Sequence, residues 1–166
     1  MEDSRIALRA IPVKQVDTVK DLWLELAEHH WRHAQRIAAL ASPVTPAVSW
    51  SMRRAQYESW ASGPGWLLLG SELDGRLVGY AASRVVPVAS SWDFGERMGK
   101  LETLVIQPGM RDRSTGRQLF DAVRRHWRAL GVDYGSVSVM AENSGAVRFY
   151  EGLGAVEHSR IFYYPA

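Results

Sequence analysis

The segment LVIQPGMRDRSTGRQLF, residues 104–120, constrains the fold of this chain more than any other stretch. It starts as an apolar run, breaks at Pro108, and continues as an amphipathic pattern with apolar residues at helical spacing. This pattern continues past the segment: its apolar residues are Leu119, Val123, Trp127 and Leu130. Gly131 follows as an expected C-terminal cap. A strand that runs directly into a helix is typical of a β-α-β unit. The segment therefore predicts a mixed α/β fold, with residues 108–116 between the strand end and the helix start.

The rest of the chain adds strands that suit antiparallel pairing, and further helices. Strands are predicted over residues 5–11, 66–73, 76–86, 100–106, 134–141 and 155–164. Helices are predicted over residues 16–41, 47–61 and, with Ser144 as its N-cap, 144–152. The Asp74-Gly75 pair between the second and third strands is a strong hairpin signal. The predicted order is β-α-α-β-β-β-α-β-α-β: one domain over residues 1–166, whose mixed, mostly antiparallel central sheet is flanked by helices.

The composition limits the chemistry of the chain. A length of 166 residues suits one domain with a sizeable core, and 46% apolar and 23% charged residues are ordinary for a globular protein. The absence of cysteine excludes disulfides, thiolate metal sites and a cysteine nucleophile, and it fits a reducing compartment. The N-terminal residues are too polar for a secretory signal, and no apolar run approaches the ~20 residues that span a membrane. We therefore expect a cytoplasmic protein with no membrane partner.

Positive charge is local rather than general in this sequence. The formal net charge is only +2, so nucleic acid is not the expected partner. Between residues 111 and 128, however, six arginines stand against two acids, Asp112 and Asp121. A local basic patch suits a compact anionic ligand better than a long polyanion, whereas a solvated helix face is the usual explanation of such a cluster. The charge pattern alone leaves both explanations open.

The start of the helix that follows Pro108 has the properties of a phosphate site. The first N–H groups of a helix have no partner inside the helix, and the helix dipole adds about half a positive charge there. Gly116 allows close approach to the backbone, Ser114 and Thr115 offer hydroxyls, and the arginines add charge-assisted contacts. The P-loop pattern GxxxxGK with a following Ser or Thr is absent, and so is the dinucleotide pattern GxGxxG. We interpret the segment as a pyrophosphate site of another kind.

Two motifs in the second half of the chain resemble those of the GNAT superfamily of acetyl-CoA-dependent N-acetyltransferases. The first is LVIQPGM followed by RDRSTG, which resembles the family's apolar strand and glycine-containing helix start. Ser114 replaces the first glycine of that pattern. The second motif is ENSGAVRFYEGLGA, with Asn143, Phe149 and Tyr150. The motifs cover residues 101–155 and follow the family's order, whereas the N-terminal half agrees only in outline.

The resemblance implies acetyl-CoA as co-substrate and assigns roles to individual residues. It implies that the coenzyme contacts Leu104, Val105, Ile106, Arg111, Asp112, Arg113, Ser114, Thr115, Gly116, Arg117, Asn143 and Phe149. Within this set, the backbone of residues 104–106 holds the pantetheine arm, and an N–H near Val105 or Ile106 polarises the acetyl carbonyl. Tyr150 stands at the family's position for the group that protonates the leaving thiolate, and a core tyrosine is the alternative.

Glu102 is the candidate general base, because many members of the family carry a carboxylate in this part of the strand. By strand alternation, Glu102, Leu104 and Ile106 are expected on one face. Thr103 and Val105 are expected on the other. The alternatives for Glu102 are pairing with an arginine or exposure to solvent, and a water wire can replace it as the path for the amine proton.

Acidic and aromatic residues in two segments are the acceptor-site candidates, because such groups suit a cationic amine. They are Glu28, His29, Trp31, Trp92, Asp93 and Phe94, from EHHWRH and SSWDFGERM. Glu25, His29 and His33 share a helical face, which a solvated surface explains better than a metal site, so no metal is expected. The terminal FYY, residues 162–164, fits an acceptor wall, a homodimer surface or a plain strand.

The resemblance implies an N-acetyltransferase that moves an acetyl group from acetyl-CoA to a primary amine in a ternary complex. No cysteine is present to support a cysteine-linked ping-pong route. The amine can belong to a small molecule or a peptide, and an acyl group larger than acetyl is an alternative. A CoA-binding sensor on the same fold, without catalysis, is the main alternative function. A basic nucleic-acid-binding protein is a further one, which the small net charge disfavours.

Overall fold

The sheet of the computed structural model, which describes residues 6–110 and 114–165, has five strands in the order of the sequence. The strands are β1 (Ile6–Ala10), β2 (Leu67–Leu73), β3 (Arg76–Pro87), β4 (Arg97–Ile106) and β5 (Gly135–Val137). The first four pair antiparallel with their neighbours, and β5 pairs parallel with β4. The prediction of a mixed, mostly antiparallel sheet is confirmed.

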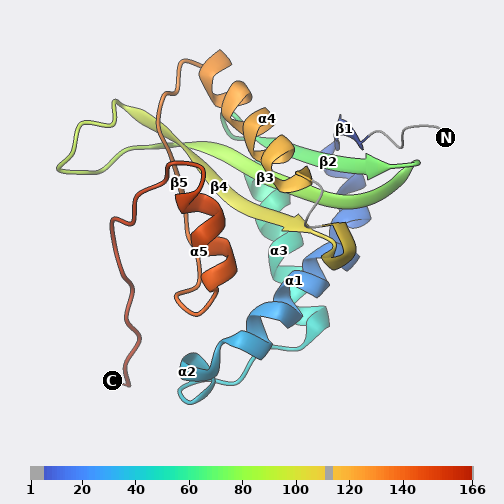
Figure 1. Cartoon of the computed structure of the whole chain (residues 1–166), viewed down its shortest axis with the longest axis vertical. Helices are drawn as coiled ribbons and strands as arrows, with labels where there is room; N and C mark the ends of the chain where they lie inside the picture. Colours follow the sequence, from blue (N-terminus) through green and yellow to red (C-terminus); the bar gives the residue numbers. More distant parts are fainter. Residues whose placement is uncertain (1–5, 111–113, 166) are drawn as a thin grey trace.

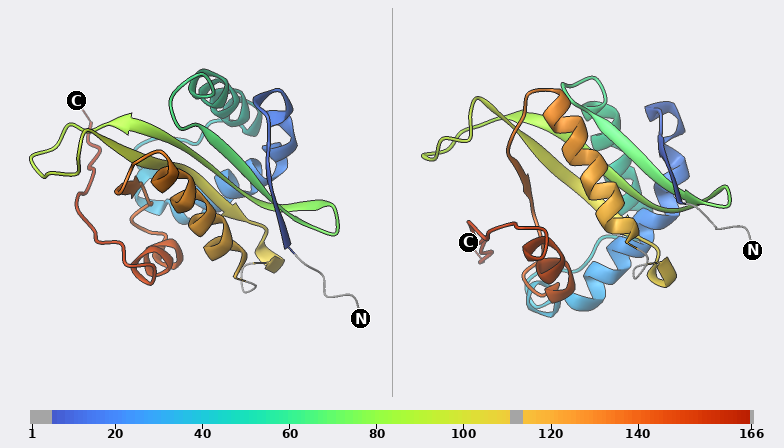
Figure 2. Two further views of the ribbon diagram at one scale, coloured as in Figure 1. Left: turned by 90° about the horizontal axis from the view of Figure 1, so that it is seen from above. Right: turned by 45° about the horizontal axis from the view of Figure 1, so that its top comes forward.

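Helices cover both faces of this sheet (Figure 1). They are η1 (Val13–Val19), α1 (Lys20–His33), α2 (Gln35–Ala38), α3 (Pro46–Trp60), η2 (Pro108–Met110), α4 (Thr115–Ala129) and α5 (Ser144–Glu151). In Figure 1, α1 and α3 lie behind the sheet and α4 and α5 lie in front of it. The left view of Figure 2 shows the sheet between α3 and α4. One layer of helix therefore meets each face of the sheet.

The prediction of one continuous helix over residues 16–41 is wrong in detail. The segment begins as the 3-10 helix η1, continues as α1, and is interrupted at Ala34, whose φ of −96° and ψ of 51° leave the helical region. Ala34 is buried, so packing holds the break in place. Apolar spacing reports which face meets the core rather than the backbone angles. A break that keeps the buried face therefore leaves no signal in the pattern.

The turn between β2 and β3 confirms the predicted hairpin. Asp74 and Gly75 have φ values of 50° and 74°, as a type I′ turn requires. The twist of this turn matches that of the flanking strands, and glycine adopts its second position without steric cost. The register of the two strands is therefore fixed locally, by two residues that the sequence already identifies.

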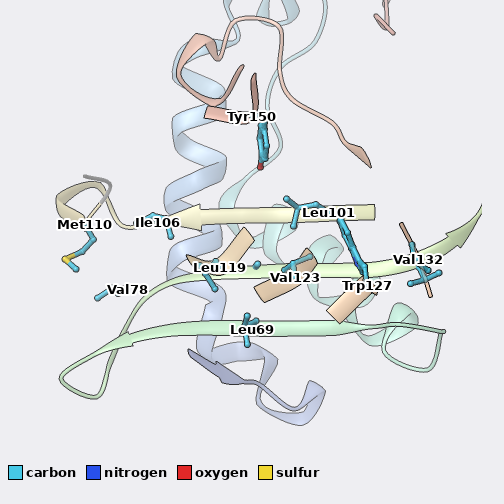
Figure 3. Close-up of a cluster of buried hydrophobic side chains, with 12 residues drawn as sticks. Leu69, Val78, Leu101, Ile106, Met110, Leu119, Val123, Trp127, Val132 and Tyr150 are labelled. Atoms are coloured by element: carbon cyan, nitrogen blue, oxygen red, sulfur yellow. The ribbon is translucent and has the colours of Figure 1, made fainter. Parts of the chain in front are cut away.

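Two hydrophobic cores lie on opposite faces of the sheet. The core under α4 contains Leu119, Val123 and Trp127 of that helix and Tyr150 of α5 (Figure 3). The core under α1 and α3 contains Val16, Val19, Leu22, Trp50 and Tyr57. Full burial of a large apolar side chain contributes about 1.5–3 kcal/mol, so each layer is held to the sheet by several such contributions. The sheet is consequently fixed from both sides.

The parallel pairing of β4 and β5 is confined to one end of β4. It extends from Gly99↔Gly135 to Leu101↔Val137. Trp127 of α4 packs on both glycines, because a Cβ atom on Gly99 or Gly135 would lie 2.2 or 2.3 Å from its ring. The indole therefore closes the two strands against each other at this end. Beyond Leu101, no described residue pairs with this side of β4 as a strand.

Two strand predictions near the C-terminal end need correction. The strand predicted over residues 134–141 is reduced to β5, which is three residues long. The strand predicted over residues 155–164 is not formed within the described residues, so the observed order lacks its final β. Val156, Ile161 and Phe162 are between 75% and 88% exposed. A strand needs a neighbour for its backbone groups, and the short β5 offers only a short edge. Residues 155–164 therefore have the composition of a strand but form an exposed segment.

Candidate functional site

A bulge in β4 lies at Glu102, in the middle of the segment that resembles a family motif. Ala82 of β3 pairs with Thr103, and Ser83 pairs with Leu101, so Glu102 is skipped in the ladder. In a bulge, two residues of one strand oppose one residue of its partner, and the regular alternation of side chains is interrupted. The faces predicted by simple alternation therefore cannot hold across this point.

The bulge places Glu102 on the α3 face of the sheet, which corrects the predicted arrangement. Leu104 and Ile106 do lie together, against or within the core under α4. Glu102 instead binds Arg84, whose guanidinium lies 4.4 Å from the ring centroid of Trp60 on α3. The candidate base thus faces the layer formed by α1 and α3.

Beyond the bulge, the backbone N–H and C=O groups of successive β4 residues point alternately toward β3 and toward the opposite edge of the strand. Gln107 donates its N–H to the carbonyl of Val78 at 2.8 Å, and the register pairs Val105 with Tyr80. In an antiparallel ladder, the backbone groups of such hydrogen-bonded residues point toward the partner strand, and those of the residue between them point away from it. The N–H and C=O of Leu104 therefore point to the side where pairing with β5 has ended. Val105 directs its backbone to β3.

Helix α4 starts without a capping side chain among the described residues. Its N-cap residue, Ser114, makes no side-chain bond to the helix backbone, and its hydroxyl accepts from Gln118 Nε2 at 3.1 Å. The starts of α3 and α5 differ, because Thr45 Oγ1 and Asn143 Oδ1 accept backbone N–H groups there at 3.3 and 3.1 Å. No described side chain caps the N–H groups at the start of α4, and a helix start of this kind attracts an anion.

Ser114 adopts a left-handed backbone conformation, with φ 58° and ψ 3°. Glycine adopts this conformation without the steric cost that a Cβ atom imposes. This geometry explains why the motif that the chain resembles has glycine where Ser114 stands. The chain keeps the glycine-like turn despite the serine.

The next two residues fit a ligand that approaches the backbone closely. Thr115 is fully buried, and its Oγ1 has no hydrogen-bond partner among the described residues. A Cβ atom on Gly116 would meet Phe149 at 3.5 Å and Ile106 at 3.7 Å, which is ordinary contact. The φ of Gly116 is not positive either. The fold itself therefore does not require glycine here, whereas close approach of a ligand explains it.

The other predicted coenzyme contacts differ in their surroundings. The predicted contacts Arg111, Asp112 and Arg113 lie outside the described residues, and Arg117 is exposed. Phe149 of α5 is half-buried beside the start of α4. Asn143 caps α5 through its side-chain oxygen, which corrects the prediction that Ser144 is the N-cap. Its amide NH₂ group makes no hydrogen bond to a described residue and remains a donor for a ligand.

Tyr150 extends from α5 with its hydroxyl directed toward β4, between Leu101 and Ile106 (Figure 3). The residue is 8% exposed, and its ring packs edge to face on Phe149 and Phe120 at 5.1 and 6.0 Å. No described residue hydrogen-bonds to the hydroxyl. Burial raises the pKa of Tyr150 above its ordinary value. The phenol therefore stays protonated, with its O–H available to a ligand at the edge of β4.

Glu102 is largely buried and is held by two cations. Its Oε1 accepts from Arg84 Nε at 2.7 Å and lies 3.7 Å from Lys100 Nζ. This is the arginine pairing that remained an alternative from the sequence. The second carboxylate oxygen, Oε2, has no partner among the described residues. The ion pairs fix the orientation of the carboxylate and leave one oxygen to accept a proton.

The structure does not bring the two predicted acceptor segments together. Glu28, His29 and Trp31 belong to α1, behind the sheet. Trp92, Asp93 and Phe94 belong to the loop between β3 and β4, which projects from the end of the sheet and lies apart from α1 in every view (Figures 1 and 2). Of the two segments, only that on α1 lies on the face toward which Glu102 turns.

Neither a cluster of metal-ligating side chains nor a membrane-spanning helix is found in the described part of the chain. No three His, Asp or Glu side chains there are arranged to hold a metal ion. His29 and His33 stack with ring centroids 4.2 Å apart. No helix among the same residues is long and apolar enough to cross a membrane.

Sequence reasoning missed a polar and aromatic network behind β4. The hydroxyl of Tyr57 bonds with Thr103 Oγ1 at 2.6 Å and with the hydroxyl of Tyr80 at 3.2 Å, and all three residues are buried. Arg53, one turn before Tyr57 on α3, lies 4.2 Å over the ring of Trp23 on α1. The signal in the sequence is the i, i+4 spacing of Arg53 and Tyr57, which is common in helices and points to no ligand by itself.

Together, these features fit a long ligand with an anionic end. The uncapped start of α4 fits a pyrophosphate, with Thr115 Oγ1 and the open backbone at Gly116 beside it. The free edge at Leu104 fits an amide-containing arm. The hydroxyl of Tyr150 is directed at the same strand and fits a sulfur leaving group. Coenzyme A has these three parts in this order, so the residues present fit it.

Comparison with known proteins identifies the family and the fold. The chain matches the family model described as Acetyltransferase (GNAT) family over residues 23–155. A curated relative, the mycothiol acetyltransferase of Saccharomonospora viridis, is 29% identical over 104 residues, which are 63% of this chain and 34% of the relative. This chain therefore spans about a third of the length of the curated relatives that it matches.

Two solved structures share the fold. An aminoglycoside N-acetyltransferase in complex with CoA has a TM-score of 0.70 at 19% identity, covering 99% of this chain and 97% of the other. The tetramutant of a Bacillus halodurans protein has a TM-score of 0.74 at 19% identity, covering 96% and 99%. The family model spans both motifs and all of β4, α4 and α5. This chain belongs to the acetyltransferase (GNAT) family.

Proposed function

We propose that this protein transfers the acetyl group of acetyl-CoA directly to a primary amine while both substrates are bound. One observation carries the proposal. The start of α4, which no described side chain caps, lies beside Ile106 of β4, and the hydroxyl of Tyr150 is directed at the same strand, beyond the point where its pairing with β5 has ended. An anion site, a hydrogen-bonding strand edge and a proton donor are thereby combined in one site.

Each part of the site supports one requirement of acetyl transfer. The start of α4 supports binding of the pyrophosphate. The edge at Leu104 supports the pantetheine arm and offers an N–H to the acetyl carbonyl, where negative charge develops; loss of one such donor in other enzymes costs about 3 kcal/mol. The amine nitrogen forms a bond to the acetyl carbon, and the carbon–sulfur bond breaks. The absence of cysteine favours this direct attack over a cysteine-linked acyl intermediate.

The relatives favour a small-molecule acceptor. One is a mycothiol acetyltransferase, and one solved structure is an aminoglycoside N-acetyltransferase. A panel of polyamines, amino acids, aminoglycosides and short peptides, with thiol release from acetyl-CoA as the readout, tests the proposal. We expect thiol release that depends on an amine. If acetyl-CoA binds and no amine increases thiol release, the alternative of a CoA-binding sensor is favoured instead.

Replacement of Tyr150 by Phe tests the proton donor. Because the ring is kept and only the O–H is lost, we expect kcat to fall by about tenfold to a hundredfold, with the Kd for CoA changed by less than about twofold. Burial raises the pKa of Tyr150, so the wild-type rate should show no loss from Tyr150 ionisation below about pH 10. Tyr134→Phe, at a half-exposed tyrosine of the loop before β5, is the control. Equal kcat values for Tyr150→Phe and the control would show that Tyr150 is not the proton donor.

Replacement of Glu102 by Gln tests the general base. We expect kcat/KM to fall most at lower pH, because an amine with a pKa of about 10 is almost entirely protonated there. Glu72→Gln is a matched control, since Glu72 also binds an arginine of a neighbouring strand, Arg9 at 2.7 Å, but lies on β2. A fall in kcat/KM of the same size at every pH would instead indicate that Glu102 acts only by positioning Arg84.

A further inference from the structure

Arg53 of α3 is a half-buried cation without a carboxylate partner among the described residues. Its guanidinium carbon lies 4.2 Å from the ring centroid of Trp23, 5.5 Å from that of Tyr57 and 5.9 Å from that of Trp60. Its Nε is buried and has no hydrogen-bond partner within residues 6–110 and 114–165. Three aromatic rings therefore hold the charge, and none of them neutralises it.

The neighbouring arginine, Arg54, shows the ordinary arrangement on the same helix. It binds Asp17 at 3.2 Å and Glu58 at 2.9 Å on the surface of the protein. Arg53 is less exposed than Arg54 and has no comparable partner. Removal of a charge from water is unfavourable unless another charge compensates it, so an unpaired buried donor on a cation requires an explanation.

The residues around Arg53 supply further positive charge. Arg84 lies 4.4 Å over the ring of Trp60, which Arg53 also approaches. Arg84 and Lys100 share a single carboxylate, that of Glu102. Two cations thus already share the single carboxylate of Glu102, and Arg53 adds a further positive charge.

Helix α1 does not neutralise Arg53 either. A titratable group of α1 that Arg53 affects is His30, whose pKa is lowered by burial first and then by its neighbours His29, Arg53 and His33. The acids nearest in sequence to His30 are exposed: Glu28 pairs with Arg32 at 3.9 Å, and Glu25 is exposed one turn earlier. This wall of the site is therefore cationic.

Arg53 lies on the same side of β4 as the candidate base. Tyr57, whose ring Arg53 approaches, bonds through its hydroxyl to Thr103 at 2.6 Å. Thr103 directly follows Glu102 and directly precedes Leu104, whose backbone edge the proposed acetyl group would meet. Arg53 and Glu102 therefore lie on the same face of β4 and are linked through Tyr57 and Thr103.

We propose that Arg53 binds a carboxylate of the acceptor, so that the substrate class is a small amine that also carries a carboxylate. This inference rests on the proposed acetyl transfer and specifies its acceptor. A guanidinium pairs with a carboxylate through two parallel hydrogen bonds, and the Nε of Arg53 has no such partner among the described residues. A polycationic amine would instead meet like charge on Arg53, Arg84 and Lys100.

The test compares amino acids with their carboxamides at equal chain length: glycine, β-alanine, γ-aminobutyrate and ε-aminocaproate. For at least one pair, the wild-type kcat/KM should be about tenfold or more higher for the carboxylate. Arg53→Met should bring that ratio to about one, and Arg53→Lys should retain part of it, because Lys keeps the charge and loses the planar fork. Arg54→Met is the matched control and should retain the full ratio.

Thermal unfolding of the CoA-bound protein gives a second readout that does not require acetyl transfer. The preferred carboxylate should raise the Tm of the wild type and of Arg54→Met, and it should not raise that of Arg53→Met. If this occurs without amine-dependent thiol release, the carboxylate site stands and acetyl transfer is wrong. Three results would show that the carboxylate site is wrong. The carboxamides could match the carboxylates both in kcat/KM and in the rise of Tm, or Arg53→Met could keep the preference for the carboxylate. The third such result is that no carboxylate has the higher kcat/KM or raises the Tm.

Discussion

Ser114 holds a left-handed backbone conformation that costs a residue with a Cβ atom about 1–2 kcal/mol. Replacement by Gly removes this cost, and the greater flexibility of the unfolded chain offsets about 0.4–1 kcal/mol of the gain. We therefore expect Ser114→Gly to raise the free energy of unfolding by about 0.5 kcal/mol in urea titrations. The Kd for CoA should change by less than about twofold, because the backbone N–H groups are kept.

The control for this prediction is Ser144→Gly. Ser144 begins α5 with an ordinary helical backbone, so glycine there should lower the free energy of unfolding by roughly 0.5 kcal/mol. If Ser114→Gly destabilised the protein as much as Ser144→Gly, the left-handed turn would not be a source of strain.

Residue types at the site were predictable where they belong to local motifs, and side-chain directions were not. Gly116, Phe149 and Tyr150 stand within short segments whose spacing is visible in the sequence. The face of Glu102 depends on a bulge, and the bulge depends on pairing with β3. Arg53 meets Trp23 only after α1 and α3 pack together. Neither contact follows from local periodicity.

At the scale of elements, the closed end of the β4–β5 pair depends on a helix that packs on two glycines. A Cβ atom on Gly135 would lie 2.3 Å from the Trp127 ring, so Gly135→Ala should destabilise the protein by about 1–3 kcal/mol. A loss of this size lowers Tm by roughly 2–4 °C per kcal/mol for a chain of this length. Scanning calorimetry checks this.

Gly145→Ala is the matched control for Gly135→Ala. The nearest atom to a Cβ on Gly145 is 3.7 Å away, and alanine favours the helix in which this residue lies. We expect an unchanged or higher Tm. Equal Tm values for the two variants would show that Trp127 does not close this end of the strands.

The elements that were predicted correctly carry their own start and stop signals. The β2–β3 hairpin has Asp74-Gly75 at its turn, and α3 begins at Pro46 after the cap Thr45. The break at Ala34 and the missing final strand have no such local signal. The first occurs at a residue that tertiary packing buries, and the second depends on whether a partner strand exists. Burial and the presence of a partner strand are both properties of the tertiary structure.

For the whole molecule, the two helix layers serve two parts of the proposed reaction. In this proposal the layer of α4 and α5 would bind the coenzyme and the layer of α1 and α3 would bind the acceptor, with β4 between the two layers (Figure 1). A homodimer is one of the alternatives for the terminal FYY segment, and sedimentation velocity tests it. Because this chain spans about a third of its curated relatives, the acceptor has to be established on this protein itself.

The central claim is that the start of α4 binds the pyrophosphate of coenzyme A. Calorimetric titration of acetyl-CoA into the wild type and Gly116→Ala tests it most directly. The fold accommodates the added methyl group, whose nearest neighbour lies at 3.5 Å, so the Tm without ligand should be unchanged or higher. We predict one-site binding to the wild type and an affinity at least about tenfold weaker in Gly116→Ala, because the added methyl group would restrict the approach of a phosphate to the backbone N–H groups. Equal affinity of the two proteins, or no binding to the wild type, would contradict the claim.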